Sequence, residues 1–366
     1  MIKESNYNYD ANTKIMKVME NMIPRFIFNG AQYTDIEKVM ANAYDRKSWY
    51  NEWIKLGDEY EKLAKKSEEE SFFISAKEYY LLASNCYRTS HVIIYQTNEE
   101  KISSYKQEIL CYQKAAKYFD GELQKVRIPY KETEVSGYLW KPMNIDKPPC
   151  VVVIHGADST KEEYHTFNEY FIKRGVAVLI IDGPGQGESI LFSNIHMDNN
   201  FENVAKATMD FLQKREDIDK NRIAIAGQCM GAYQALRSAA SDDRFKACVA
   251  ISPFYYLESW TKESVPMALK KMVIHVYNLK GYDELKEFAP TISLENVLHN
   301  IKCPVMVMHG SKDVFVEECD AEKIMEEIKA TKKFIVYPEG VHALLNHFKE
   351  SRTKMADWIC NIFNEK

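Results

Sequence analysis

The sequence has no long apolar run and no excess of positive charge. Nowhere does it approach the roughly 18 consecutive apolar residues that a membrane-spanning helix needs. Its first ten residues, MIKESNYNYD, are polar and lack the apolar core of a signal peptide. The formal net charge is -5, which gives no reason to expect a nucleic acid or an anionic membrane as partner. We therefore expect a cytoplasmic protein that binds neither.

Paired cysteines are also missing. The eight cysteines are scattered along the 366 residues, with no CxxC pair and no spacing typical of metal ligands. With no export signal, we expect reduced thiols, most of them small buried side chains, and we expect no metal ion. The cysteines are Cys86, Cys111, Cys150, Cys229, Cys248, Cys303, Cys319 and Cys360.

One glycine-rich segment, DGPGQGES at residues 182–189, resembles a phosphate loop at first sight. It lacks the Lys-Ser/Thr ending of a Walker motif, and its glycine spacing does not match a dinucleotide-binding fingerprint. We interpret it as a tight turn after a strand and predict no cofactor. Glu188 could face a pocket, but a solvated carboxylate is the expected role.

Residues 1–120 contain almost no glycine and show a helical rhythm. Apolar residues recur at steps of three and four in three stretches, which places them on one helix face. The spacing predicts three long helices after one or two others, in an all-helical domain over 1–120. A tetratricopeptide-type repeat would need a fixed period, which is absent. The stretches run through residues 49–63, 73–87 and 102–119.

From residue 121 the pattern changes. LQKVRIPY and ETEVSGYLWKP predict an antiparallel strand pair, and short apolar runs then alternate with amphipathic segments up to residue 366. Apolar strands without polar alternation are typical of a sheet covered on both faces. We predict an α/β fold, a doubly wound and mostly parallel sheet. The stretch 254–300 interrupts the alternation, and we expect it to form helices over the active site.

The central motif is GQCMG, in which Gly227 and Gly231 flank Cys229. It follows the apolar strand RIAIA and opens the helix AYQALRSAA, which is the context of a nucleophile elbow with cysteine in place of serine. The glycines leave room for the sharp turn, and the positive helix amino terminus favours a thiolate. The motif predicts that Cys229 is a catalytic nucleophile.

Two partners follow in the expected chain order of nucleophile, acid and histidine. Asp313 lies just past the strand PVMVMHG, and His342 lies past the next strand, KFIVYPE. Both loops leave the carboxyl edge of the sheet, where ligands bind in such folds. We expect His342 to take the thiol proton and Asp313 to orient its ring. His347 and Asp320 are weaker rivals because each falls within a predicted helix.

An oxyanion hole needs two backbone N–H groups. We expect one from Met230 and the other from Ala157 or Asp158, in the loop after CVVVIHG. His155 either holds this loop or touches substrate, and the first role is favoured.

Two further side chains could reach substrate from a strand-end loop. Tyr255 and Glu258 follow the strand ACVAISP. Tyrosines at helical spacing elsewhere in the chain are more often core than pocket, so the aromatic content alone does not define a substrate.

The motifs VVIHG, DGPGQGES, GQCMG, HGSKD and EGVH resemble the α/β-hydrolase superfamily over residues 121–366. The helical front part resembles a branch that includes 2,6-dihydroxypseudooxynicotine hydrolase, polyketide-shortening hydrolases of the yellowish-green type and fermentation–respiration switch proteins. The resemblance implies an amino-terminal helical cap, and several members of the branch cleave carbon–carbon bonds next to a ketone. Caps of this architecture often take part in homodimers.

One departure from that branch concerns Cys229, since its members usually have serine there, whereas dienelactone hydrolases use cysteine. The leading hypothesis is a cofactor-independent hydrolase that forms a thioester with a small, aromatic or polyketide-like acyl or β-diketone substrate. An acyltransferase or cyclase that passes the acyl group to an acceptor other than water is an alternative. A non-catalytic regulatory protein that keeps the fold is a third.

Overall fold

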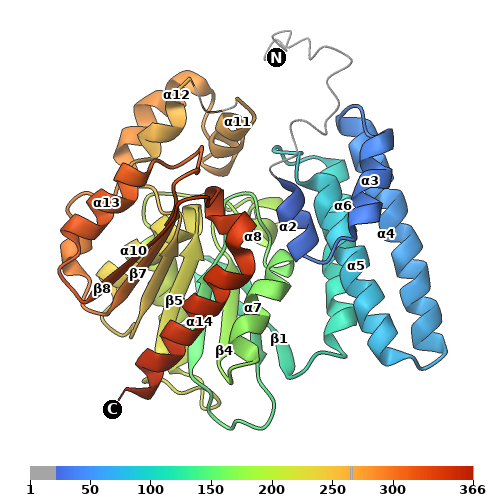
Figure 1. The fold of residues 1–366 in the computed structure, drawn as a ribbon, viewed down its shortest axis with the longest axis horizontal. Coiled ribbons are helices and arrows are strands. Elements are labelled where there is room, and N and C mark those ends of the chain that lie inside the picture. The colour runs from blue at the N-terminus through green and yellow to red at the C-terminus, as the bar shows by residue number, and fades with distance from the viewer. Residues whose placement is uncertain (1–21, 264, 266, 366) are drawn as a thin grey trace. The chain divides into compact units, whose positions relative to one another are not determined.

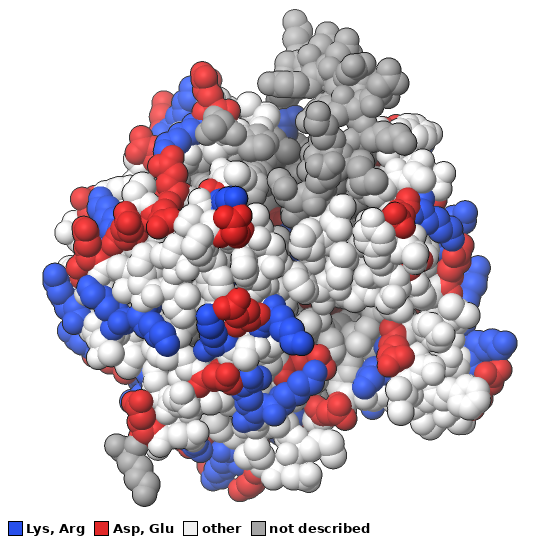
Figure 2. Space-filling model, viewed as in Figure 1, with Lys and Arg blue, Asp and Glu red and all other residues white. Residues whose placement is uncertain are grey.

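The computed structural model describes residues 22–263, 265 and 267–365. The chain divides into two compact units, Met1–Phe119 and Asp120–Lys366. Among the described residues, no helix is long and apolar enough to cross a membrane. On the face drawn in Figure 2, acidic and basic side chains are interspersed.

The first unit is built from helices. The three long predicted helices are present, and two short helices precede them in the described part. Asp45 starts the first long helix with a capping box, in which its carboxylate accepts from the N–H of Ser48 and the Ser48 hydroxyl accepts from the N–H of Asp45. The helices are α2 (Ile23–Phe28), α3 (Tyr33–Asn42), α4 (Arg46–Glu69), α5 (Phe73–His91) and α6 (Glu99–Ala116).

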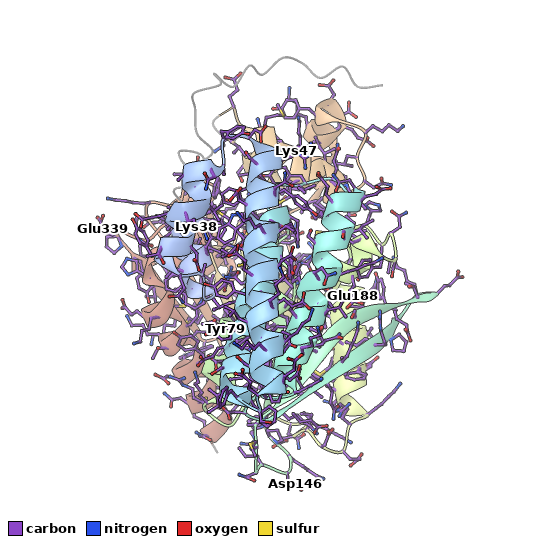
Figure 3. All side chains as sticks on the ribbon, turned by 90° about the vertical axis from the view of Figure 1, so that its right-hand side faces the viewer. Lys38, Lys47, Tyr79, Asp146, Glu188 and Glu339 are labelled. Atoms are coloured by element: carbon purple, nitrogen blue, oxygen red, sulfur yellow. The ribbon has the colours of Figure 1, made fainter. Side chains whose placement is uncertain are left out.

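Aromatic side chains form much of the core of this unit. The rings of Trp49 and Trp53 lie 5.7 Å apart at their centroids, and Phe26 packs against both. Farther along α4, Tyr60 stacks on Tyr79 of α5, which Figure 3 labels. The apolar rhythm of the sequence therefore marks the helix faces that pack together.

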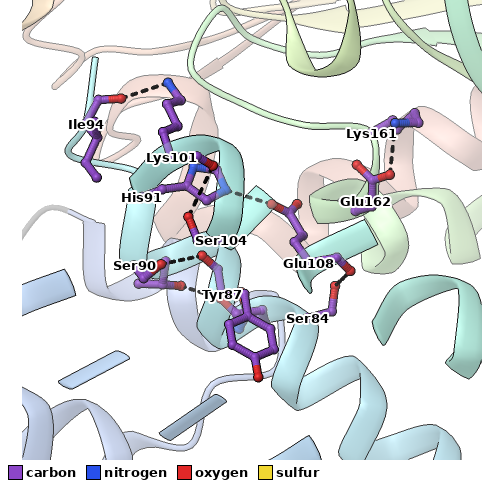
Figure 4. A network of polar contacts seen from close by, with 12 residues as sticks. Ser84, Tyr87, Ser90, His91, Ile94, Lys101, Ser104, Glu108, Lys161 and Glu162 are labelled. Carbon is purple, nitrogen blue, oxygen red and sulfur yellow. Dashed lines mark hydrogen bonds and ion pairs between the residues drawn. The ribbon is translucent and has the colours of Figure 1, made fainter. Parts of the chain in front are cut away.

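A buried polar pair joins α5 to α6. His91 Nε2 lies 2.8 Å from the Glu108 carboxylate, and the Ser84 hydroxyl donates to the Glu108 carbonyl oxygen (Figure 4). Burial, with help from the positive charges of Arg88 and Lys101, holds the pKa of His91 well below its usual value. The imidazole and the carboxylate form a buried hydrogen bond between the two helices.

The second unit contains one eight-stranded sheet in the order β1-β2-β4-β3-β5-β6-β7-β8. β1 pairs with β2, and β2 with β4, in antiparallel fashion, whereas every other pairing is parallel. The predicted hairpin and the predicted parallel sheet are both confirmed. The strands are β1 (Glu122–Tyr130), β2 (Thr133–Lys141), β3 (Cys150–Ile154), β4 (Ala177–Asp182), β5 (Ile223–Gln228), β6 (Cys248–Ile251), β7 (Val305–Gly310) and β8 (Lys332–Tyr337).

Helices cover both faces of this sheet, which is why every residue of β3, β4, β6 and β7 is buried. Figure 1 shows α7 and α14 side by side on the face toward the viewer, with α10 behind the sheet. The helices outside the insertion are α7 (His165–Ile172), α8 (Gly187–Leu191), α9 (Phe201–Gln213), α10 (Met230–Ser241), α13 (Glu318–Glu327) and α14 (Phe348–Asn364).

Short helices fill the stretch between β6 and β7. The Tyr277 hydroxyl donates to the sulfur of Met230 over 3.7 Å, and the N–H of Met197 donates to the carbonyl of Val276. The first contact brings the residue after α11 to Met230, which follows Cys229, and the second ties the end of α11 to the segment before α9. The elements are η3 (Leu257–Thr261), α11 (Met267–Val276), α12 (Tyr282–Phe288), η4 (Ala289–Thr291) and η5 (Leu298–Asn300).

Candidate active site

Cys229 occupies a strained turn between β5 and α10. Its backbone has φ 56° and ψ -123°, a conformation that residues other than glycine rarely adopt. The N–H of Cys229 donates to the carbonyl of Ile251 over 2.9 Å, which ties the turn to the end of β6. The side chain is partly exposed, whereas five other cysteines are buried. The turn therefore presents this sulfur at the carboxyl edge of the sheet.

The two glycines of the motif are required by close backbone packing. A Cβ atom on Gly227 would lie 2.0 Å from the carbonyl oxygen of Gly231. One on Gly231 would lie 2.1 Å from the carbonyl oxygen of Ile154, at the end of β3. Any side chain at either position would push the turn away from the sheet.

His342 and Asp313 meet at the same edge. His342 Nδ1 lies 2.7 Å from Oδ2 and 2.9 Å from Oδ1 of Asp313. The Asp313 carboxylate also accepts from the N–H groups of Phe315 and Val316, at 2.9 and 3.0 Å. Its side chain is fully buried, whereas that of His342 is 16% exposed. The acid is held rigidly from one side, and the imidazole keeps an open side.

The charges of the three side chains are coupled. Burial lowers the pKa of His342, but the Asp313 carboxylate and, after it, the nearby Cys229 sulfur raise that pKa well above its usual value. Burial raises the pKa of Asp313, but the imidazole and the two backbone donors outweigh it and lower that pKa. Since Nδ1 faces Asp313, Nε2 is the nitrogen left for the sulfur. The arrangement favours a proton on the imidazole.

The loop that carries His342 is also held by packing. The ring of Phe315 meets the His342 ring edge to face, with centroids 5.0 Å apart. The rival base His347 lies at the end of η6 (His342–His347), where its ring packs on Tyr337. Asp320 lies in α13, as expected. The structure brings neither rival into a hydrogen bond with Cys229 or His342 in the part of the chain that it describes.

The backbone N–H groups of Met230 and Ala157, which the sequence predicts for an oxyanion hole, belong to segments next to Cys229. Met230 is the first residue of α10, and a Cβ atom on Gly156 would lie 3.7 Å from Cβ of Cys229, so the loop that carries Ala157 passes beside the sulfur. Within the described ranges, the N–H groups of Met230 and Ala157 donate to no protein acceptor. Asp158 follows on the same loop and is half-buried.

His155 lies beneath this loop and is fully buried. Its Nε2 lies 3.0 Å from Asp182 Oδ1, and its Nδ1 lies 2.9 Å from the carbonyl oxygen of Gly156. Gln186 donates to the carbonyl oxygens of both His155 and Gly156. These bonds turn the carbonyls toward Gln186. The structure therefore places His155 in the support of the loop, the role that the sequence favoured.

A buried cation that sequence reasoning missed lies in the same support. Lys161 Nζ contacts the carboxylates of Asp182, Glu162 and Glu188 at 2.7, 2.9 and 2.9 Å, and its side chain is not exposed at all. Burial lowers the pKa of Lys161, but the three carboxylates raise it well above its usual value. The ammonium therefore stays charged.

The expectation that Glu188 is solvated is wrong. Its side chain is 4% exposed, and it pairs with Lys125 and Arg127 as well as with Lys161. Burial is possible because three cations surround one carboxylate. The glycine-rich segment is a turn, as predicted, and Gly185 and Gly187 have φ of 79° and 38°.

Tyr255 and Glu258 are not brought to the sulfur. Tyr255 is buried, and its hydroxyl donates to Glu327 of α13 over 2.6 Å. Glu258 is exposed on η3. No polar contact links either side chain to Cys229 or His342 in the described residues. The same part of the chain holds no group of three or more His, Cys, Asp or Glu side chains arranged for a metal ion.

The mostly parallel eight-stranded sheet, the elbow after β5 and the paired acid and histidine after β7 and β8 define an α/β-hydrolase, and the protein is an enzyme of this class. The chain belongs to the esterase FrsA-like family, whose sequence profile matches residues 17–282. A second profile, that of serine aminopeptidase S33, matches residues 279–348.

Individual relatives agree with this assignment. The 2,6-dihydropseudooxynicotine hydrolase of Paenarthrobacter nicotinovorans is 28% identical over 343 residues, which cover 92% of this chain and 90% of the relative. The α/β-hydrolase xenA of Xenoacremonium sinensis is 35% identical over 240 residues, 62% of this chain and 56% of the relative. The crystal structure of 2,6-dihydroxy-pseudo-oxynicotine hydrolase superposes with a TM-score of 0.85 at 26% identity, over 93% of this chain and 95% of that one.

Proposed function

We propose that the protein is a cofactor-independent hydrolase that uses Cys229, His342 and Asp313 through a thioester intermediate. The observation that supports this most directly is the pair of His342 and the buried Asp313 carboxylate, 2.7 Å apart, at the same sheet edge as the strained turn of Cys229. A nucleophile, a base and an orienting acid in this order are the elements of covalent acyl transfer.

The reaction would run in two halves. His342 Nε2 takes the thiol proton, and the Cys229 sulfur attacks the substrate carbonyl while the N–H groups of Met230 and Ala157 bind the oxyanion. As the bond to the leaving group breaks, His342 returns the proton to that group. In the second half His342 takes a proton from water, whose oxygen attacks the thioester carbonyl. Cys229 leaves with the proton returned by His342, and the acid product is released.

We infer a small substrate with an aromatic or polyketide-like acyl or β-diketone group. Two observations support this class. The first is the relationship to a pseudooxynicotine-type hydrolase along most of both chains. The second is the aromatic environment of the base. Phe315 packs on His342, and the ring centroids of Trp260 and Phe315 lie 6.4 Å apart. A cysteine sulfur forms the thioester readily when the leaving group of the substrate is activated, which favours β-diketone, ester or thioester substrates over amides.

The sulfur nucleophile also supports a second candidate, acyl transfer to an amine, alcohol or carbanion. One experiment separates the two. Purified protein is given p-nitrophenyl acetate, with and without an added amine, and both acetate and the acetylated amine are quantified for wild type, Cys229→Ser and Cys229→Ala. Hydrolysis predicts that acetate dominates with the amine present, and transfer predicts the amide. Wild-type turnover by Cys229→Ala would contradict both.

A further inference from the structure

Arg352 is a fully buried cation on α14. Its guanidinium lies between two aromatic rings, 4.5 Å from the centroid of Phe348 and 5.4 Å from that of Phe167 on α7. Within the described ranges, no carboxylate pairs with it, and its Nε has no hydrogen-bond partner. Burial lowers the pKa of Arg352 to about 10. Burying a charge without an anion costs free energy. Aromatic contacts and hydrogen bonds must therefore stabilise the guanidinium of Arg352 in place of an ion pair.

The hydrogen bonds of Arg352 join the two catalytic loops. One nitrogen, Nη2, donates to Oε1 of Gln228 at 2.5 Å and to the carbonyl oxygen of Ala343 at 3.0 Å. Gln228 directly precedes Cys229, and Ala343 directly follows His342. The guanidinium of Arg352 therefore bridges the residue before the nucleophile, Gln228, and the residue after the base, Ala343. The other terminal nitrogen, Nη1, donates to Ser351.

The peptide that Arg352 holds is a strained one. Ala343 has φ 56° and Leu344 has φ 54°, both in the left-handed region that non-glycine residues rarely enter. The N–H of Ala343 donates to the hydroxyl of Ser252 over 3.0 Å, while its carbonyl accepts from Arg352. Two side chains from different elements thus fix both ends of the residue that follows His342. Such strain persists only where the surroundings determine it.

We propose that Arg352 is a positioning residue that sets the distance between the Cys229 sulfur and the His342 ring. It acts through Gln228 and Ala343 and does not touch substrate. The inference rests on the proposed function, because it gives Arg352 a role in the transfer of the thiol proton. A small misplacement of a reacting group lowers the rate without altering how substrate binds.

Four variants test the proposal. Arg352→Met keeps the length and apolar packing of the side chain but removes the donors, and Arg352→Lys keeps one ammonium. Ser252→Ala removes the other anchor of Ala343. The matched control is Arg174→Met, because Arg174 pairs with Asp357 of helix α14 over 2.7 Å and, within the described residues, bonds to neither loop. For each, kcat and KM for p-nitrophenyl acetate and the thermal midpoint are measured.

A second readout does not need turnover. The rate at which iodoacetamide alkylates Cys229 is followed by peptide mass spectrometry from about pH 5 to pH 9, a range that brackets the usual imidazole pKa. The rate of alkylation reports how closely the His342 ring, whose pKa is raised, lies to the sulfur. We expect Arg352→Met to lower kcat about 10- to 100-fold with KM nearly unchanged, and to move the alkylation profile to higher pH.

The remaining variants show whether the loss of kcat in Arg352→Met comes from a misplaced catalytic group or from a folding defect. Arg352→Lys should recover part of kcat, and Ser252→Ala should shift kcat and the alkylation profile in the same direction as Arg352→Met. Arg174→Met should change neither. Equal kcat and equal alkylation profiles in wild type and Arg352→Met would overturn the proposal. If Arg352→Met does not fold, an unchanged Ser252→Ala overturns it instead. Activity retained by Cys229→Ala would contradict the proposed function. The alkylation profiles of wild type and Arg352→Met would still test whether Arg352 positions the His342 ring next to the sulfur.

Discussion

Nδ1 of His342 lies 2.7 Å from Oδ2 of Asp313, and Asp313 is itself held by two backbone N–H groups. The acid therefore fixes both the orientation of the ring and the nitrogen that carries a proton.

Asp313→Asn should lower kcat by a factor of about 10³ to 10⁴, since an amide favours the wrong tautomer of His342. Its oxygen can still accept from Phe315 and Val316, so the thermal midpoint should change little. Steady-state kinetics with p-nitrophenyl acetate measure the effect. Asp320→Asn on α13 serves as control and should keep wild-type activity. A wild-type rate for Asp313→Asn would show that the acid has no part in the reaction.

The raised pKa of His342 makes its contribution to stability depend on pH. The pKa in the folded state exceeds that in the unfolded state, so the stabilisation is fully present below the unfolded value of about 6.5 and is lost as the pH rises through the folded value. We therefore expect the free energy of unfolding of wild type, relative to His342→Gln, to be largest near pH 6 and to fall toward alkaline pH. Urea unfolding at a series of pH values measures it. A difference that grows with pH would contradict the raised pKa.

Gly231→Ala should destabilise the elbow, because the new Cβ would lie 2.1 Å from the Ile154 carbonyl oxygen. The expected loss is about 2 kcal/mol or more in free energy of unfolding, together with most of the activity. Gly281→Ala is the control, since a Cβ there meets nothing within 4 Å and φ is 173°. Equal free energies of unfolding for the two variants would mean that the elbow can accommodate a methyl group at residue 231 despite this close contact.

The cluster of Lys161 and Asp182 should be sensitive to loss of one charge. Asp182→Asn leaves the buried ammonium of Lys161 with less compensating charge, which should cost about 3–5 kcal/mol. Asp198→Asn breaks the more exposed pair with Lys131 and should cost about 0–1 kcal/mol. Chemical unfolding of both proteins at neutral pH gives the comparison. A small loss in free energy of unfolding for Asp182→Asn would mean that the remaining charges around Lys161 rearrange to compensate for the lost carboxylate.

Much of the fold could be predicted from the sequence, because local pattern determines it. The alternation of apolar runs and amphipathic segments predicts the parallel sheet, and steps of three and four predict α4, α5 and α6. The elbow is also local, since its glycines and Cys229 are adjacent in the chain. Asp313 and His342 could be found because each follows a strand, and parallel strands bring their carboxyl ends to one edge.

The supporting residues could not be found in the same way. Lys161 stands in a polar stretch, and nothing local shows that three carboxylates will surround it. The burial of Glu188 is equally hidden from the sequence, since a carboxylate in a glycine-rich turn is usually solvated. Arg352 lies 124 residues from Gln228, on a helix whose pattern shows only a buried face. Such contacts depend on the packing of distant elements, which composition and spacing do not encode.

The most direct test is to find the residue that carries the acyl group. Wild-type protein is mixed briefly with p-nitrophenyl acetate, quenched in acid and digested. The mass of every cysteine-containing peptide is then measured by mass spectrometry. Cys319 is exposed and reports on non-specific acylation. The account predicts one acetyl group on Cys229, formed far faster than on Cys319 and much more slowly in His342→Gln. Rapid turnover with no acyl group on Cys229, or equal labelling of both cysteines, would contradict it.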